Sequence, residues 1–184
     1  MSRPGWLVSI AVSTLLLGGC SGDEPSASPP SEPPSTTSAA SPPTPTPPSP
    51  PASARKHNKA GAVAFAYHFV DVLNYSAASG HLKELHEVST SSCVSCRNVA
   101  RGLSDVYEAG GSLRGGDLKV KGHSALRANA SLWTVGLEVS TAPQVIKASS
   151  NASPRRVKGG SYSLTVDVMR QDAGWVIPRF ERAR

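Results

Sequence analysis

The feature that most limits what this chain can fold into is a stretch of 34 residues, Ser21 to Ala54, with almost nothing to bury. Pro, Ser, Thr and Ala account for 30 of these residues (12, 9, 4 and 5), and no aromatic or large aliphatic residue is present. Such a composition cannot offset the entropy lost on folding, and its proline runs favour the extended polyproline conformation. We therefore expect a disordered spacer over residues 20–54, open to O-linked sugar, and one globular domain over residues 55–184.

A short apolar run precedes this spacer. It follows the basic residue Arg3, extends from Trp6 to Leu17 and is shorter than the roughly 20 apolar residues that cross a membrane. It closes on Leu17-Gly18-Gly19-Cys20, which resembles the lipobox of bacterial lipoproteins. The resemblance implies a signal peptide over residues 1–19 and acyl chains such as palmitate on Cys20. It also implies a cell-membrane anchor that leaves the domain on the extracytoplasmic side. An ordinary cleaved signal and an uncleaved helix are the alternatives, and neither needs a cysteine here.

The globular part is basic. Residues 55–184 hold 18 Lys+Arg against 10 Asp+Glu, a formal charge of +8. In the cytosol this charge would favour nucleic acid, but outside the membrane we expect anionic headgroups or wall polymers instead. Arg155, Arg156 and Lys158 are the candidate contacts with an anionic surface, and an ordinary solvated loop is the alternative.

The first half of the domain has helical periodicity. Apolar residues three and four positions apart predict a helix over Ala60–Ser76 whose buried stripe includes Phe65, Phe69 and Leu73. A shorter helix is expected over His81–Val88. A third helix is expected to begin with an N-cap among Thr90, Ser91 and Ser92 and to end before Gly110-Gly111.

The second half switches to the two-residue period of strands. Leu132–Thr141 and Tyr162–Val168 alternate clearly, and Leu118 and Val120 suggest an earlier strand. A turn over 171–174 leads into a last strand, Trp175–Phe180, which Pro178 favours at a sheet edge. Residues 149–160 read as a loop. Helices followed by antiparallel strands predict an α+β fold, with about three helices packed on a curved sheet.

This element order resembles the cone-shaped nuclear-transport-factor-like (SnoaL-like) superfamily, and Gly174-Trp175-Val176-Ile177 is similar to its final hairpin. Leu73-Asn74-Tyr75, Cys93-x-x-Cys96 and Tyr107-Glu108-Ala109-Gly110-Gly111 together resemble an uncharacterised family of actinobacterial lipoproteins. The resemblance covers about Ala60–Phe180. It implies a cone-like fold and an envelope location, and the fold carries both enzymes and binding modules.

Cys93 and Cys96 are the remaining cysteines if Cys20 is lipidated. In an oxidising compartment we expect a structural disulfide between them. A redox-active pair is a second hypothesis, because a helix N-terminus lowers a thiol pKa. Half of a zinc site, completed by His81 and His86, is a third. The sequence predicts no cofactor and no metal.

Candidate site residues are few. His68 and Asp71 lie three apart on the first helix and suggest a general base oriented by a carboxylate, although their place beside the apolar stripe favours a solvated or rim pair. Tyr67, Tyr75 and Trp133 are candidates to line a ligand cavity, and core packing explains them equally well. His123 has no evident partner in the sequence.

The function predicted first is a binding or accessory module that meets a wall polymer, a small apolar ligand or an envelope protein. A cone-fold dehydratase or isomerase using His68 and Asp71 is the alternative. A thiol redox protein using Cys93 and Cys96 comes third.

Overall fold

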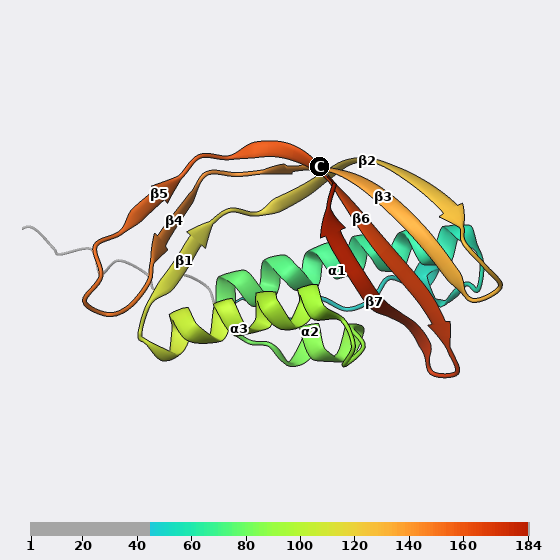
Figure 1. Cartoon of the computed structure of the whole chain (residues 1–184), viewed down its shortest axis with the longest axis horizontal. Coiled ribbons are helices and arrows are strands. Elements are labelled where there is room, and N and C mark those ends of the chain that lie inside the picture. The colour runs from blue at the N-terminus through green and yellow to red at the C-terminus, as the bar shows by residue number, and fades with distance from the viewer. Residues whose placement is uncertain (1–44, 184) are drawn as a thin grey trace, which may run out of the picture. The chain divides into compact units, whose positions relative to one another are not determined.

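A computed structural model of the chain describes residues 45–183 and contains three α-helices followed by antiparallel strands (Figure 1). A short 3-10 helix precedes them, so the helical half consists of η1 (Ala52–Arg55), α1 (Lys59–Ser79), α2 (Lys83–Val88) and α3 (Val94–Glu108). The strands are β1 (Ser112–Gly115), β2 (Leu118–Arg127), β3 (Leu132–Thr141), β4 (Gln144–Lys147), β5 (Arg155–Val157), β6 (Gly160–Gln171) and β7 (Gly174–Arg182). The predicted α+β fold, with helices packed on a curved antiparallel sheet, is confirmed.

The strands form two sheets. The larger has the order β2-β3-β6-β7 and packs on α1, and the smaller has the order β1-β4-β5. Figure 1 shows that each strand of the small sheet continues into a strand of the large one, as one ribbon bent over the helices. Hydrogen bonds cross the bend from Gly116 N to Pro143 O and from Ala142 N to Asp117 O, at 3.1 Å each. The small sheet is therefore an arm that extends the large one.

Glycines make the bend. Gly115 and Gly116 have positive φ angles of 70° and 84°, which glycine adopts without strain. A Cβ on Gly115 would lie 2.5 Å from Pro143 O, and a Cβ on Gly159 would lie 2.3 Å from Thr141 O. Two of the three strands thus cross the bend at points where a side chain has no room.

The core lies between α1 and the large sheet. α1 begins at the N-cap Asn58, whose side chain accepts from Gly61 N, and ends at Gly80 in the left-handed conformation. Its predicted stripe is buried, together with Val135, Leu137 and Val139 of β3. Ala54 of η1 is also buried in this core, one residue before the expected domain start.

Most element bounds agree with the sequence predictions. The exceptions are the N-cap of α3, the length of β2, and the strands β1, β4 and β5, which the sequence did not predict. The N-cap of α3 is Cys93, not one of the preceding hydroxyl residues, because the Cys93 sulfur accepts from Cys96 N. β2 is ten residues long, although the sequence pattern indicated only Leu118 and Val120. Its alternation is weak because it is an edge strand with a register shift between Val120 and Gly122. The expected loop over 149–160 contains β5. β7 lies at the other edge of the sheet, as Pro178 predicts.

Within residues 45–183, no helix combines the length and the apolar content that crossing a bilayer requires.

Candidate functional site

An open groove of about 630 Å³ lies beside the first half of α1. Its wall along the helix is a second apolar stripe, formed by Ala60, Val63, Ala64 and Tyr67. Pro51, which is the N-cap of η1, Ser53 within η1 and His123 of β2 also line the groove. Lys59 lines it at the start of α1. The volume falls in the range of small-molecule sites, and an apolar lining with a few polar groups is typical of them.

Tyr67 and His123 form the polar end of this groove. The Tyr67 hydroxyl and His123 Nδ1 are hydrogen-bonded at 3.1 Å, and the two rings meet edge to face with centroids 5.7 Å apart. The sequence supplied no partner for His123, because 56 residues separate the two side chains. Lys59, on the same helix, lies about 12 Å from Tyr67 at 1.5 Å per residue. The groove therefore has an apolar middle and a polar group at each end.

A smaller cavity of about 200 Å³ lies inside the fold, between α1, α3 and the large sheet. Asn74 lines it but is already paired, since its amide donates to Leu118 O at 2.9 Å and accepts from Leu118 N at 2.8 Å. None of the residues that line this cavity is Asp, Glu or His: they are Leu73, Asn74, Ala77, Val99, Leu103, Gly116, Leu118, Tyr162, Leu164 and Phe180. This cavity therefore offers no carboxylate or imidazole side chain to a ligand.

His68 and Asp71 do not converge on either cavity. His68 is buried, at 3% exposure, with Nδ1 unpaired, whereas Asp71 is exposed. The expected solvated pair is therefore wrong for His68, which is buried and has Phe65 as a neighbouring ring, with centroids 5.9 Å apart. Burial lowers the pKa of His68, and the charge of Asp71 offsets part of this shift. Although Asp71 is exposed as a residue, partial desolvation of its carboxyl group raises its pKa, and the charge of His68 opposes that rise.

Of the three aromatic candidates, only Tyr67 lines the groove. Tyr75 is buried and its hydroxyl is hydrogen-bonded to His81 Nδ1 at 3.3 Å. Trp133 packs against the core from β3. Sequence reasoning missed Lys59, Ala60, Val63 and Ala64, although their three- and four-residue spacing was a usable signal beside the first stripe. α1 is apolar around most of its circumference, so one stripe could not be separated from the other.

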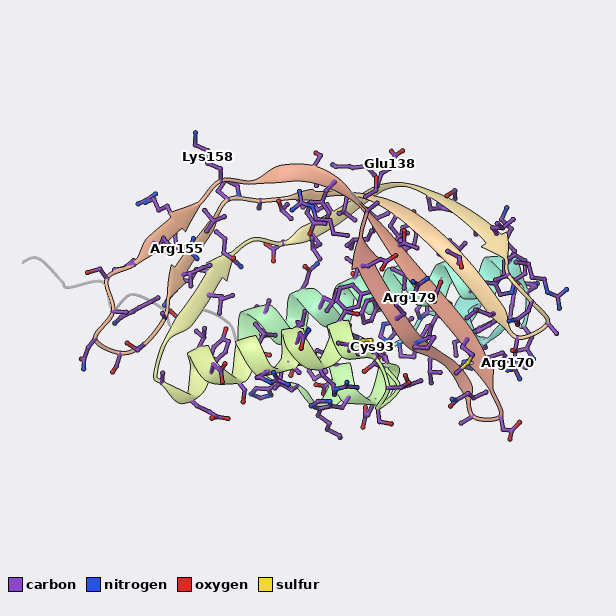
Figure 2. All side chains as sticks on the ribbon, in the orientation of Figure 1. Cys93, Glu138, Arg155, Lys158, Arg170 and Arg179 are labelled. Atoms are coloured by element: carbon purple, nitrogen blue, oxygen red, sulfur yellow. A yellow bond between two sulfur atoms is a disulfide. The ribbon has the colours of Figure 1, made fainter. Side chains whose placement is uncertain are left out.

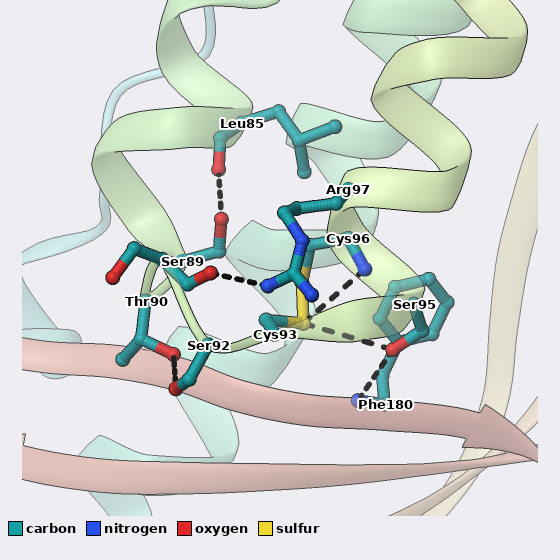
Figure 3. Close-up of a disulfide and its surroundings, with 10 residues drawn as sticks. Leu85, Ser89, Thr90, Ser92, Cys93, Ser95, Cys96, Arg97 and Phe180 are labelled. Atoms are coloured by element: carbon teal, nitrogen blue, oxygen red, sulfur yellow. Dashed lines mark hydrogen bonds between the residues drawn. A yellow bond between two sulfur atoms is a disulfide. The ribbon is translucent and has the colours of Figure 1, made fainter.

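Cys93 and Cys96 form a disulfide at the start of α3 (Figure 3). Their exposed fractions are 0% and 2%, so neither sulfur is open to attack by another thiol. The Ser95 hydroxyl, between them, accepts a hydrogen bond from Phe180 N of β7 at 3.3 Å. This setting supports a structural role over the redox alternative. For the zinc alternative, residues 45–183 hold no group of three or more side chains that would bind a metal.

The basic candidates Arg155 and Arg156 lie in β5, so their side chains alternate between the two faces of the arm. Strand register places Arg114 and Arg156 in one row, on either side of Val145. Lys158 follows the strand and points away from the helices (Figure 2). The sequence suggested a single basic loop, whereas the structure places the arginines on both faces of a small sheet. Their contact with an anionic surface stays a prediction.

Comparison with known proteins places the chain in a family. Residues 33–181 match the model described as "Family of unknown function (DUF6318)". The chain belongs to the DUF6318 family. This match extends through both sheets and all three helices of the DUF6318 domain, and it begins in the proline-rich segment. No curated protein matches the chain significantly.

Solved structures resemble the DUF6318 domain in fold. The intermembrane space region of the chloroplast protein ARC6 is 12% identical with a TM-score of 0.51, over 69% of this chain and 97% of that one. Aln2 from a Streptomyces species is 7% identical with a TM-score of 0.45, over 70% and 94%. A protein named Rd1NTF2_05 is 12% identical with a TM-score of 0.37, over 64% and 96%. At these identities the likeness concerns the fold alone.

Proposed function

We propose that this domain is a binding module for a small apolar ligand, which it holds in the groove beside α1. The observation that carries the proposal is the size and lining of that cavity, about 630 Å³ with an apolar wall from Ala60, Val63 and Ala64. Burying an apolar ligand against such a wall supplies the affinity, at about 25 cal/mol per Å² of apolar surface removed from water. Lys59 and the pair Tyr67–His123 supply orientation at the two ends.

The groove is tested by filling it. Ala64→Trp places an indole in the middle of the apolar wall, whereas Ala78→Trp places the same side chain on an exposed position of the same helix, outside the groove. N-phenyl-naphthylamine, an uncharged apolar fluorophore, is titrated into the full chain carrying Cys20→Ala, which keeps acyl chains out of the assay. We expect saturable binding in the parent and in Ala78→Trp, and at least a tenfold weaker affinity in Ala64→Trp. Equal affinity in all three chains would remove the groove from the proposal.

We also propose that the module is a lipoprotein, tethered to the outside of the cell membrane through Cys20. The pattern Leu17-Gly18-Gly19-Cys20 and the proline-rich segment after it support this. Two acyl chains hold a protein stably at a bilayer, at about 0.8 kcal/mol per buried CH₂, whereas one chain binds marginally.

Replacing Cys20 by Ala is expected to move the protein from the membrane fraction into the medium and to abolish incorporation of labelled palmitate. Cys93→Ala combined with Cys96→Ala serves as the control that removes cysteines elsewhere, and it is expected to stay membrane-bound. Retention of the Cys20→Ala protein in the membrane fraction would contradict the anchor.

A further inference from the structure

A second cavity, of about 340 Å³, lies on the other side of the segment 50–57 from the groove. One wall consists of residues of that segment, including Arg55 and His57, and the other is the hairpin between β6 and β7, with Arg170 and Asp172. Phe65 of α1 and Trp175 of β7 form the floor. We name this cavity the hairpin cleft.

Positive charge dominates the hairpin cleft. Arg55, His57 and Arg170 line it against one carboxylate, that of Asp172. In the described part of the chain, the ion pairs involve Lys83 and Arg179, and neither Arg55 nor Arg170 takes part in one. The hydrogen bond that Arg170 makes uses Nε, which donates to Gln171 O at 3.0 Å. Arg55 and Arg170 thus line the cleft without an ion pair among the described residues, and the terminal nitrogens of Arg170 are not used by its bond to Gln171 O.

The floor is fixed in place before any ligand binds. Trp175 and Phe65 are 8% and 7% exposed, and the indole Nε1 donates to Lys56 O at 3.2 Å, which joins the floor to the wall formed by the segment 50–57. The Arg170 guanidinium lies 5.9 Å from the centre of the Trp175 ring, so the cation is held against the aromatic floor. A preorganised cleft loses less entropy when a ligand binds.

We propose that the hairpin cleft is a binding site for a small aromatic anion. The carboxylate or phosphate of the ligand accepts hydrogen bonds from Arg55 and Arg170, and its ring lies on the floor made by Trp175 and Phe65. Arginine is suited to this role, because its planar fork of donors matches the oxygens of either oxyanion. The site is separate from the groove and does not depend on the function proposed for it.

The test uses four probes in the full chain carrying Cys20→Ala. Phenyl phosphate and benzoate combine a ring with an oxyanion, inorganic phosphate offers charge alone, and benzyl alcohol offers the ring alone. Calorimetry gives the affinity, and the NMR signal of the Trp175 indole N–H reports where the probe binds. We expect one or both aromatic anions to bind with a dissociation constant in the millimolar range or below and to shift the indole signal. Their affinity is expected to be at least tenfold higher than that of inorganic phosphate or benzyl alcohol.

Variants locate the site. Arg170→Gln and Arg55→Gln are each expected to weaken the aromatic anion at least tenfold, and Arg55 is exposed, so its replacement leaves the fold intact. Arg156→Gln, an exposed arginine of the arm, is the matched control and is expected to bind like the parent. Ala64→Trp, which fills the groove, is also expected to bind like the parent. Unchanged affinity in both cleft variants, or no binding of either aromatic anion at millimolar concentration, would overturn the proposal.

Discussion

Replacing Gly115 by Ala is expected to lower the free energy of unfolding by about 2–3 kcal/mol, because two costs combine at this position. The φ of 70° strains any residue with a Cβ. The added Cβ also meets Pro143 O at 2.5 Å, and that oxygen already accepts the hydrogen bond from Gly116 N that carries the ladder across the bend. Relieving the contact therefore disturbs the junction between the arm and the large sheet.

Gly102→Ala is the matched control, because the same methyl group is added in the middle of α3 with nothing within 4 Å. Alanine is the better helix former, so this variant is expected to gain about 0.5–1 kcal/mol. Urea unfolding curves of the parent and both variants give the three free energies. If Gly115→Ala unfolds at the same urea concentration as the parent, the bend does not require glycine.

Removing the disulfide by the double replacement of Cys93 and Cys96 with Ala is expected to cost about 2–3 kcal/mol. Closing a loop of four residues contributes about 2 kcal/mol in the chain-entropy model. The remainder is the N-cap, since the Cys93 sulfur accepts from Cys96 N at 3.2 Å and alanine offers no acceptor there. Alanine is chosen over serine so that no new hydroxyl is buried in a site where both sulfurs are inaccessible.

Reductant provides the control for the disulfide. Unfolding curves with and without dithiothreitol are expected to differ by about 2 kcal/mol in the parent and to coincide in the double variant. A strongly oxidising redox pair gives a different result, because its reduced form is stabilised relative to its oxidised form. Coincident curves for the parent would therefore favour the exchange hypothesis over a structural disulfide.

Local periodicity predicted the helices and the central strands of this fold. The alternation in β3 gave its bounds directly, Leu132–Thr141, because one face of that strand packs on the core. The arm escaped prediction for the opposite reason. Its strands have three or four residues, and none of their side chains belongs to the buried core, so burial imposes no pattern on them.

The cavities depend on contacts between residues far apart in the sequence. Tyr67 was a candidate from its residue type, but its hydrogen bond with His123 spans 56 positions and no local pattern contains it. Likewise, the hydrogen bond from the Trp175 indole to Lys56 O spans 119 positions and defines the hairpin cleft. His68 shows a related difficulty. Its spacing on the helix suggested a solvated or rim position, but the tertiary structure buries its side chain.

The chain enters the fold through Pro50 to His57, and this short segment contributes walls to two cavities at once. A force applied to the chain before this segment would act first on η1 and on the hydrogen bond from the Trp175 indole to Lys56 O. Because residues of this segment line both cavities, a pull that displaces it would alter a wall of each. Occupancy of either cavity would then be sensitive to mechanical load, a quantity that single-molecule stretching from the N-terminus measures.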